Sequence, residues 1–151
     1  MAITVNGVDD LRKLAGGDLG TSEWIEVTQE RIDTFADATG DHQWIHVDTE
    51  KAAQGPFGAT VAHGYLTLSL FIPLFTELLD VRGVTTKVNY GLDKVRFPSP
   101  VRVGSRIRLV GRLAGVEDVP GGVQITVDDT IEIEGAQKPA AELRSLSRLY
   151  A

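Results

Sequence analysis

The sequence predicts one α+β domain in which long antiparallel strands curl around a buried helix. From about Gly64 to Leu79 the segment is apolar on nearly every face, and a helix of that kind belongs in a protein interior. Residues 84–150 instead alternate between apolar and polar side chains with a period of two, which is typical of strands. The 151 residues suffice for one sizeable core, and no internal repeat or long linker divides them, so we expect a single domain over 1–151.

The first half of the chain is expected to be mainly helical. The patterns predict a helix over 8–14, a short strand over 23–27, and helices over 28–40, 48–53 and 64–79. Thr28 and Asp48 are suited to cap the starts of two of these helices, and Gly40 to end the first. Pro73 should kink or break the apolar helix, because it has no backbone N–H to donate.

The second half supplies the sheet. Strands are expected at about 84–97, 105–117, 122–134 and 139–150. Glycine and proline at 119–122, and Gly135 at the start of 135–138, stand where hairpin turns belong.

Charge is distributed unevenly. The chain carries 15 basic and 21 acidic residues, net −6, a balance that disfavours nucleic acid and anionic membranes as partners. Residues 85–112 nevertheless hold seven basic residues and one acid, so this segment is locally +6 and the rest −12. For Arg102, Arg106, Arg108 and Arg112 a solvated strand face is the better interpretation, since they alternate with apolar residues. Nucleic-acid binding is the weakest interpretation, because the segment has only two aromatic residues, Tyr90 and Phe97.

The chain contains no cysteine, which removes thiol catalysis, thiolate metal sites and iron–sulfur clusters. This composition fits a reducing compartment, and the first ten residues lack the pattern of a secretory signal, so we expect a cytoplasmic protein. The most apolar stretch, 65–79, contains polar residues and is shorter than the ~18 residues of a membrane span.

All three histidines, His42, His46 and His63, lie within 22 residues. Asp41 and His46 are five residues apart, which on an ideal helix places them about 140° apart, so a turned segment must bring them together. An imidazole beside a carboxylate can exchange protons near neutral pH. Alternatively, Asp41 satisfies backbone N–H groups and His46 packs in the core. No recognised zinc spacing is present, so we expect no metal, and we assign His42 no role.

Ala62-His63-Gly64 stands at the start of the buried helix. Free backbone N–H groups there could hold a developing oxyanion, and Gly64 would let a ligand approach closely. Alternatively, Gly64 only lets helix and sheet pack tightly, while His63 caps or lines the turn.

The segment Asn89–Val101 holds Lys94 and Arg96, whose charges would favour a ligand that ends in phosphates. No glycine-rich phosphate loop and no G-x-S-x-G motif is present, so neither a nucleotide cofactor nor a serine nucleophile is expected.

Together these elements resemble the MaoC-like, (R)-specific enoyl-CoA hydratase (hydratase 2) family of hot-dog proteins. The resemblance is carried by three ordered blocks: Phe35-Ala-Asp-Ala-Thr-Gly-Asp-His-Gln-Trp-Ile-His46, Val61-Ala-His-Gly64 and Tyr90-Gly-Leu-Asp-Lys-Val-Arg-Phe-Pro98.

The resemblance implies a hot-dog fold, commonly paired into a homodimer, and a cofactor-free lyase that hydrates trans-2-enoyl-CoA to the (R)-3-hydroxyacyl thioester. It implies that Asp41 and His46 form the catalytic pair and that the Gly64 N–H binds the thioester oxygen. The further candidates for oxyanion or substrate binding are His63, Gln43, Asn89, Tyr90 and Gly91, and those for CoA phosphates are Lys94 and Arg96.

One departure from the family pattern concerns the catalytic loop, where Gln43-Trp44 replaces the usual Asn-Pro. Gln43 keeps an amide for hydrogen bonding, whereas Trp44 replaces a φ-restricting ring with a bulky indole, which affects the expected shape of the loop and the acyl pocket. Alternative functions are a dehydratase acting on acyl-carrier-protein thioesters, a hot-dog thioesterase, and a non-catalytic acyl-thioester-binding module.

Overall fold

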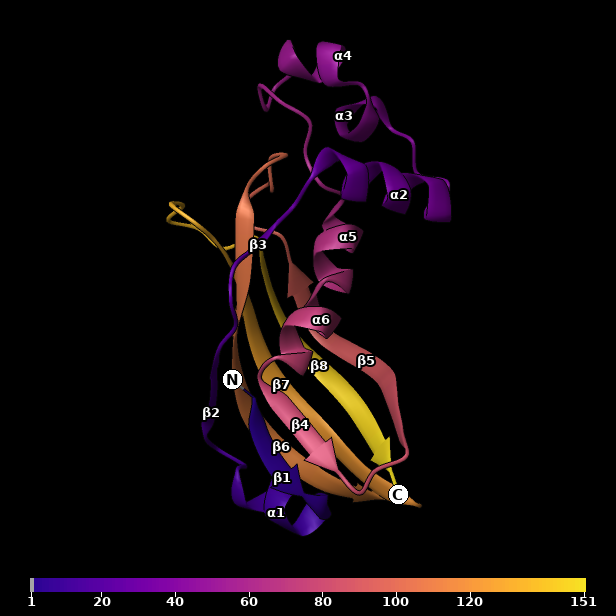
Figure 1. The fold of residues 1–151 in the computed structure, drawn as a ribbon, viewed down its shortest axis with the longest axis vertical. Helices are drawn as coiled ribbons and strands as arrows, with labels where there is room; N and C mark the ends of the chain where they lie inside the picture. Colours follow the sequence, from indigo (N-terminus) through magenta and orange to yellow (C-terminus); the bar gives the residue numbers. More distant parts are fainter. Residues whose placement is uncertain (1) are drawn as a thin grey trace.

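The computed structural model describes residues 2–151 and contains one six-stranded sheet. Its strands are β2 (Asp18–Thr21), β3 (Ile25–Glu26), β5 (Thr86–Arg96), β6 (Arg106–Val119), β7 (Gly122–Ile133) and β8 (Ala141–Tyr150). The order is β2-β6-β7-β8-β5, with β3 also on β6, and all pairs are antiparallel (Figure 1). The four long strands predicted from the alternation are confirmed.

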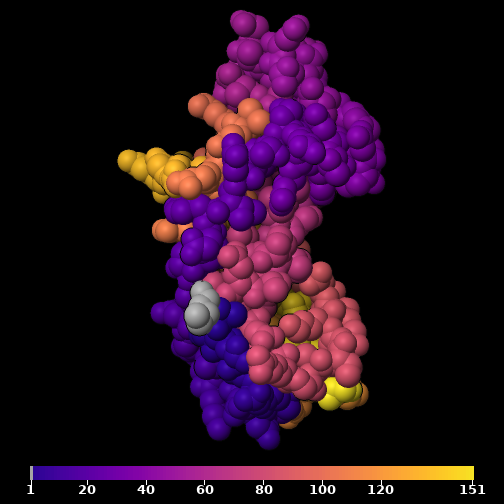
Figure 2. Space-filling model, in the orientation of Figure 1, coloured from indigo at the N-terminus to yellow at the C-terminus, as the bar shows by residue number. Residues whose placement is uncertain are grey.

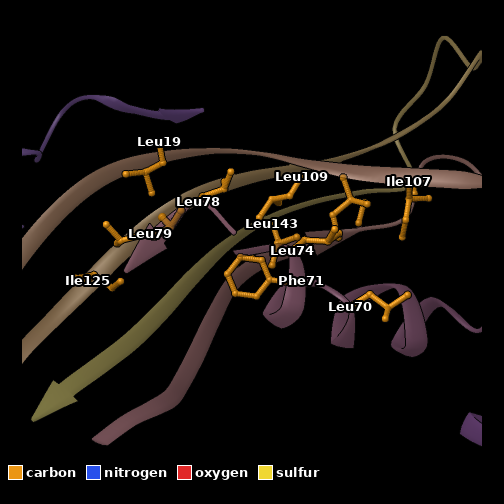
Figure 3. Packing of buried hydrophobic residues seen from close by; sticks show 14 of the residues in the cluster. Leu19, Leu70, Phe71, Leu74, Leu78, Leu79, Ile107, Leu109, Ile125 and Leu143 are labelled. Carbon is orange, nitrogen blue, oxygen red and sulfur yellow. The ribbon is translucent and has the colours of Figure 1, made fainter. Parts of the chain in front are cut away.

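The sheet curves around two consecutive helices, α5 (Gly64–Ser69) and α6 (Phe71–Thr76), which lie on one of its faces (Figure 1). Every second residue of β7 is buried, so one face of this strand belongs to the core and the other does not. Phe71 and Leu74 of α6 pack against Leu109 and Leu143 of the sheet (Figure 3). The predicted hot-dog arrangement, a helical segment wrapped by an antiparallel sheet, is therefore observed.

The predicted helical segment 64–79 is divided at Leu70, as the expected break near Pro73 requires, and its helical part ends at Thr76, three residues earlier than predicted. Pro73 explains the division. It cannot donate to the carbonyl of Ser69, but in a helix that restarts at Phe71 it occupies the first turn, where backbone N–H groups have no acceptor within the helix. The helices are also not buried on all faces, because Tyr65 is 72% and Ile72 43% exposed.

Three short elements near the N-terminus and after α6 were not predicted as strands. β1 (Ile3–Asn6) and β4 (Leu79–Arg82) form a separate parallel pair, and β2 adds to the edge of the main sheet. The partners Ile3 and Leu79 lie far apart in sequence, so no local pattern announces their pairing.

The remaining helices are α1 (Gly7–Lys13), α2 (Gln29–Thr39), α3 (Trp44–Val47) and α4 (Thr49–Ala53). The predicted caps are confirmed: the Thr28 hydroxyl accepts from the Arg31 N–H at 3.2 Å, and Asp48 accepts from the Lys51 N–H at 3.0 Å. Gly40 ends α2 in the left-handed conformation with a φ of 80°. Helices α2, α3 and α4 gather at one end of the sheet (Figure 1).

Three of the basic strand residues, Arg106, Arg108 and Arg112, form hydrogen bonds with acidic side chains or a backbone carbonyl of neighbouring segments. Arg106 bonds to Glu134, and Arg108 to Glu132 at 2.7 Å, while Arg112 donates to the carbonyl of Gly16 at 3.0 Å. These contacts agree with the interpretation of these arginines as parts of a strand face. Of the helices within 2–151, none has the length and apolar character that crossing a membrane requires.

Candidate active site

Asp41, His46 and His63 meet at the junction of α2, α3 and α5. One nitrogen or oxygen atom from each side chain lies within 4.8 Å of the others. Gly40 turns the chain at the end of α2, residues 41–43 are irregular, and α3 then begins at Trp44. The turned segment that the Asp41 to His46 spacing requires is therefore present.

His46 is held in one orientation by the main chain. Its ring is 6% exposed, and Nδ1 lies 2.6 Å from the carbonyl oxygen of Val61. A carbonyl only accepts, so Nδ1 carries the hydrogen, and in the neutral ring Nε2 is left as the proton acceptor.

Gln29 and Thr60 are hydrogen-bonded to each other and hold the main chain of His46, and the sequence interpretation missed both. Gln29 Nε2 donates to the His46 carbonyl at 2.8 Å, and Gln29 Oε1 accepts from the Thr60 hydroxyl at 2.6 Å. Both side chains are distant from His46 in sequence, so spacing alone does not identify them.

The Asp41 carboxylate is exposed, and its contact with the Gln43 N–H is long, at 3.4 Å. It is therefore largely available to water or a ligand. His42 points elsewhere, as expected: its Nε2 lies 2.9 Å from Asp37 Oδ1, and this hydrogen bond raises the pKa of His42.

His63 lies inside the protein rather than at its surface, with 2% exposure. Its ring is stacked on that of His46, with centroids 3.8 Å apart and planes inclined by 21°, and it contacts Phe35 on a centroid distance of 4.8 Å. Nε2 lies 2.9 Å from the main-chain oxygen of Asp41, whereas Nδ1 is buried without a partner among residues 2–151.

Gly64 is the first residue of α5, so its N–H has no acceptor within that helix. A Cβ at this position would lie 3.1 Å from ring atoms of Phe97. This close contact with the segment after β5 agrees with the alternative interpretation, in which Gly64 permits tight packing, while the close approach of a ligand stays a prediction.

The three side chains are suited to acid–base chemistry better than to a metal. Nitrogen lone pairs lie in the plane of an imidazole ring, so the lone pairs of two stacked rings do not converge on one ion. One nitrogen of each ring is also engaged by a main-chain oxygen, in His46 by Val61 and in His63 by Asp41.

The departure at residues 43–44 is accommodated at the edge of the site. Gln43 is exposed at the start of α3, and the half-buried indole of Trp44 turns toward α4. A Cβ on Gly55 would lie 3.0 Å from this indole, and Lys51 Nζ lies 4.6 Å from its centroid. The larger ring is therefore packed against the turn after α4.

Asn89, Tyr90 and Gly91 belong to β5 and line a hollow of about 340 Å³ beside α5 and α6. In Figure 2 the hollow opens between α6 and β5, with yellow atoms of β8 at its floor. Apolar Leu68 and Ile72 form part of its wall.

Lys94 and Arg96 line a larger hollow of about 760 Å³, together with Asp128, Glu142 and Arg144. On β7 Asp128 lies between the buried residues Val127 and Asp129, so its side chain is on the opposite, solvated face of the sheet. The hollow that Asp128 lines therefore lies on that face. Neither hollow is lined by Asp41, His46 or His63. The structure thus groups the candidates into three places: the cluster of Asp41, His46 and His63, the hollow beside β5, and the hollow on the outer face of the sheet.

Comparison with known proteins identifies the family. The model of the MaoC-like domain matches residues 10–134. The chain belongs to the MaoC-like dehydratase family. The MaoC-like chain is 54% identical over 149 residues to the 3-hydroxyacyl-thioester dehydratase Z of Mycobacterium tuberculosis, which covers 98% of this chain and 99% of the relative.

Solved structures agree with the fold of this MaoC-like protein. A monoamine oxidase regulatory protein from Archaeoglobus fulgius superposes with a TM-score of 0.78 at 23% identity, covering 100% of this chain and 99% of the other. The (R)-hydratase from A. caviae gives a TM-score of 0.71 at 24% identity, over 86% and 95% of the two chains. The predicted hot-dog fold is confirmed, and membership of a dehydratase family confirms the expected class, a hydro-lyase.

Proposed function

We propose that this protein catalyses the reversible, (R)-specific hydration of trans-2-enoyl thioesters, with acyl-CoA as the carrier substrate and without a cofactor. One observation carries the proposal: a carboxylate and an imidazole lie within 4.8 Å, and the hydrogen bond from His46 Nδ1 to Val61 leaves Nε2 as the free acceptor. The name of the mycobacterial relative, a 3-hydroxyacyl-thioester dehydratase, supports the reaction class.

In the proposed mechanism a water molecule is held between Asp41 and His46. Its oxygen forms a bond to the β-carbon of the enoyl group while a proton leaves it to the pair, and the α-carbon receives one proton, so the product contains one added water. Asp41 and His46 act as a coupled unit, without a separate assignment of acid and base. The reverse sequence removes water.

Negative charge that develops on the thioester oxygen must be stabilised by a hydrogen-bond donor near the reacting carbons. We assign this role to the N–H of Gly64, which has no acceptor within α5 and follows directly after His63. Gln43, Asn89, Tyr90 and Gly91 remain proposed substrate contacts, and Lys94 and Arg96 proposed contacts to the carrier phosphates. A carrier protein in place of CoA is the alternative that these two cations also fit.

A homodimer is part of the proposal. β5 pairs with β8 only, so its other edge is unpaired within residues 2–151. Val88, Tyr90 and Leu92 are exposed on this strand, an arrangement that a monomer would leave open to association. Pairing of β5 with a second copy would continue the sheet and cover these side chains.

The test uses purified protein and crotonyl-CoA, following the loss of enoyl absorbance and the chirality of the product. Asp41→Asn and His46→Gln should each reduce kcat by at least about 10²-fold, the upper contribution of a single acid–base group being about 10⁴. His42→Gln is the matched control and should behave as the wild type. Full activity in both folded variants would refute the assignment, and release of free thiol would indicate a thioesterase instead.

A further inference from the structure

His63 contacts both members of the proposed catalytic pair, although it lies 17 residues beyond His46. One ring face stacks on His46, and Nε2 meets the main-chain oxygen of Asp41 at 2.9 Å. Because that oxygen can only accept, Nε2 carries the hydrogen, and Nδ1 is then a bare acceptor. No group among residues 2–151 donates to this atom.

The burial of His63 argues against direct work on a substrate. Its side chain is 2% exposed, and Phe35 contacts it in addition to His46. A ring in this position has neither a free face nor an exposed nitrogen. Its function must therefore be exerted through its neighbours.

The main chain at Asp41 has few other restraints. The residue is exposed and lies in the irregular segment 41–43, and its own N–H and carboxylate make contacts of 3.4 Å only. The bond from His63 is shorter, and it comes from a buried side chain at the start of α5. Of the three hydrogen bonds to Asp41, it is therefore the shortest and the one whose partner side chain is buried.

We propose that His63 is a positioning residue, whose Nε2–H holds the backbone of Asp41 so that its carboxylate faces the His46 ring. This inference rests on the proposed function of Asp41 and His46. The position of His63 directly before Gly64 also places Asp41, His46 and the proposed thioester donor around one side chain. Catalytic groups need such support, since a misplacement of about 1 Å can cost roughly 10²-fold in rate.

Two substitutions separate the contribution of the His63 hydrogen bond to kcat from that of its ring. His63→Phe keeps an aromatic ring in contact with Phe35 and His46 but removes the hydrogen-bond donor. His63→Gln removes the ring but carries an amide N–H near the position of Nε2. We expect His63→Phe to lower kcat on crotonyl-CoA by roughly 10²-fold, with KM within about threefold of the wild-type value. The kcat of His63→Gln should be at least about tenfold higher than that of His63→Phe.

A double-mutant cycle tests whether the effect passes through Asp41. In the Asp41→Asn background, His63→Phe should lower kcat by less than about threefold, because the positioned group is already lost. If the fold-losses in kcat of Asp41→Asn and His63→Phe multiplied in the double variant, the proposal would be overturned. Equal losses of kcat in His63→Phe and His63→Gln would also overturn it. His42→Phe, at an exposed ring next to Asp41, is the matched control and should leave kcat unchanged.

A readout independent of activity keeps the two proposals apart. Backbone ¹H–¹⁵N spectra should show shifts at residues 40–43 in His63→Phe and smaller shifts there in His63→Gln. Wild-type protein without hydratase activity would refute the proposed function, while these spectra would still decide whether His63 holds Asp41. Unchanged resonances at residues 40–43 in His63→Phe would refute the positioning role.

Discussion

The side-chain amide of Gln29 donates to the main-chain carbonyl of His46 across 2.8 Å. Because its oxygen also accepts from Thr60, one side chain connects α2 and α3 with the segment that leads into α5. This connection engages the main chain of His46 and not its ring, so it holds the residue without using the free ring nitrogen.

Replacement of Gln29 should therefore affect both stability and rate. In Gln29→Ala the Thr60 hydroxyl and the His46 carbonyl lose a partner, which should lower the free energy of unfolding by about 1–3 kcal/mol. We expect kcat to fall roughly tenfold or more as His46 shifts. Urea unfolding and the crotonyl-CoA assay measure the two effects. Gln137→Ala, on an exposed turn, serves as the control; equal behaviour of both variants would contradict the prediction.

Gly64 and Phe97 form a pair that a second substitution can test. Gly64→Ala places a methyl group 3.1 Å from the Phe97 ring, so this ring must shift by a few tenths of an ångström, and we expect a small loss of stability with lower activity. Adding Phe97→Leu makes room and should restore part of both. If the double variant is no better than Gly64→Ala alone, crowding against Phe97 is not the cause.

Asp129 should make stability depend on pH. It is 3% exposed, Ser145 donates to one of its oxygens at 2.8 Å, and burial raises its pKa to about 7. Since the folded pKa exceeds the ordinary value of 3.8 for an aspartate, the native state binds more protons between these two pH values, and stability falls as pH rises through that window. The loss is at most about 4 kcal/mol, at 1.36 kcal/mol per unit.

Asp129→Asn removes this titration, so urea unfolding at pH 5, 6.5 and 8 should show a flatter dependence than in the wild type. Asp128→Asn is the neighbouring control. Asp128 bonds to Arg144 at 2.7 Å, which lowers the pKa of Asp128. Because burial is the largest cause of the raised pKa of Asp129 and the charge of Asp128 a smaller one, Asp128→Asn should reduce the slope between pH 5 and 8 only slightly. Identical slopes in wild type and Asp129→Asn would rule the prediction out.

Lys94 and Arg96 can be tested by changing the carrier. Lys94→Ala with Arg96→Ala should raise KM for crotonyl-CoA roughly tenfold and leave KM for crotonyl-pantetheine, which lacks the nucleotide phosphates, nearly constant. Arg106→Ala, whose charge is paired with Glu134, is the control. An equal change for both substrates would remove the two residues from phosphate binding.

The unpaired edge of β5 predicts the assembly state. Leu92→Lys introduces a charge where a second copy would pair, so light scattering should show a shift from dimer to monomer. Gln137→Lys adds the same charge on an exposed turn and should leave the mass unchanged. A wild-type protein that is monomeric at all concentrations would contradict the proposed dimer.

Local patterns were sufficient for most of the fold. The strands β6, β7 and β8 follow the alternation of their own residues, and the caps at Thr28 and Asp48 depend on groups three residues away. The turned segment that brings Asp41 close to His46 could also be predicted, because Gly40, which turns the chain, directly precedes Asp41.

Features that depend on distant partners could not be predicted in this way. The pairing of β1 with β4 joins opposite ends of the first half of the chain. Gln29 and Thr60 are ordinary polar residues until folding brings them to His46. The stacking of His63 on His46 likewise follows from the way α5 enters the fold, which residue spacing does not contain.

Because α2, α3 and α4 lie at one end of the sheet, the candidate site and most of the hydrophobic core belong to different parts of the molecule (Figure 1). Asp41 and His46 belong to this layer, whereas most buried apolar side chains belong to the sheet and to α5 and α6. Segments with little buried apolar surface open at a lower free energy than the whole protein. Thermal unfolding would then begin as a local event, in which the end that carries Asp41 and His46 loosens while the curved sheet still holds its shape.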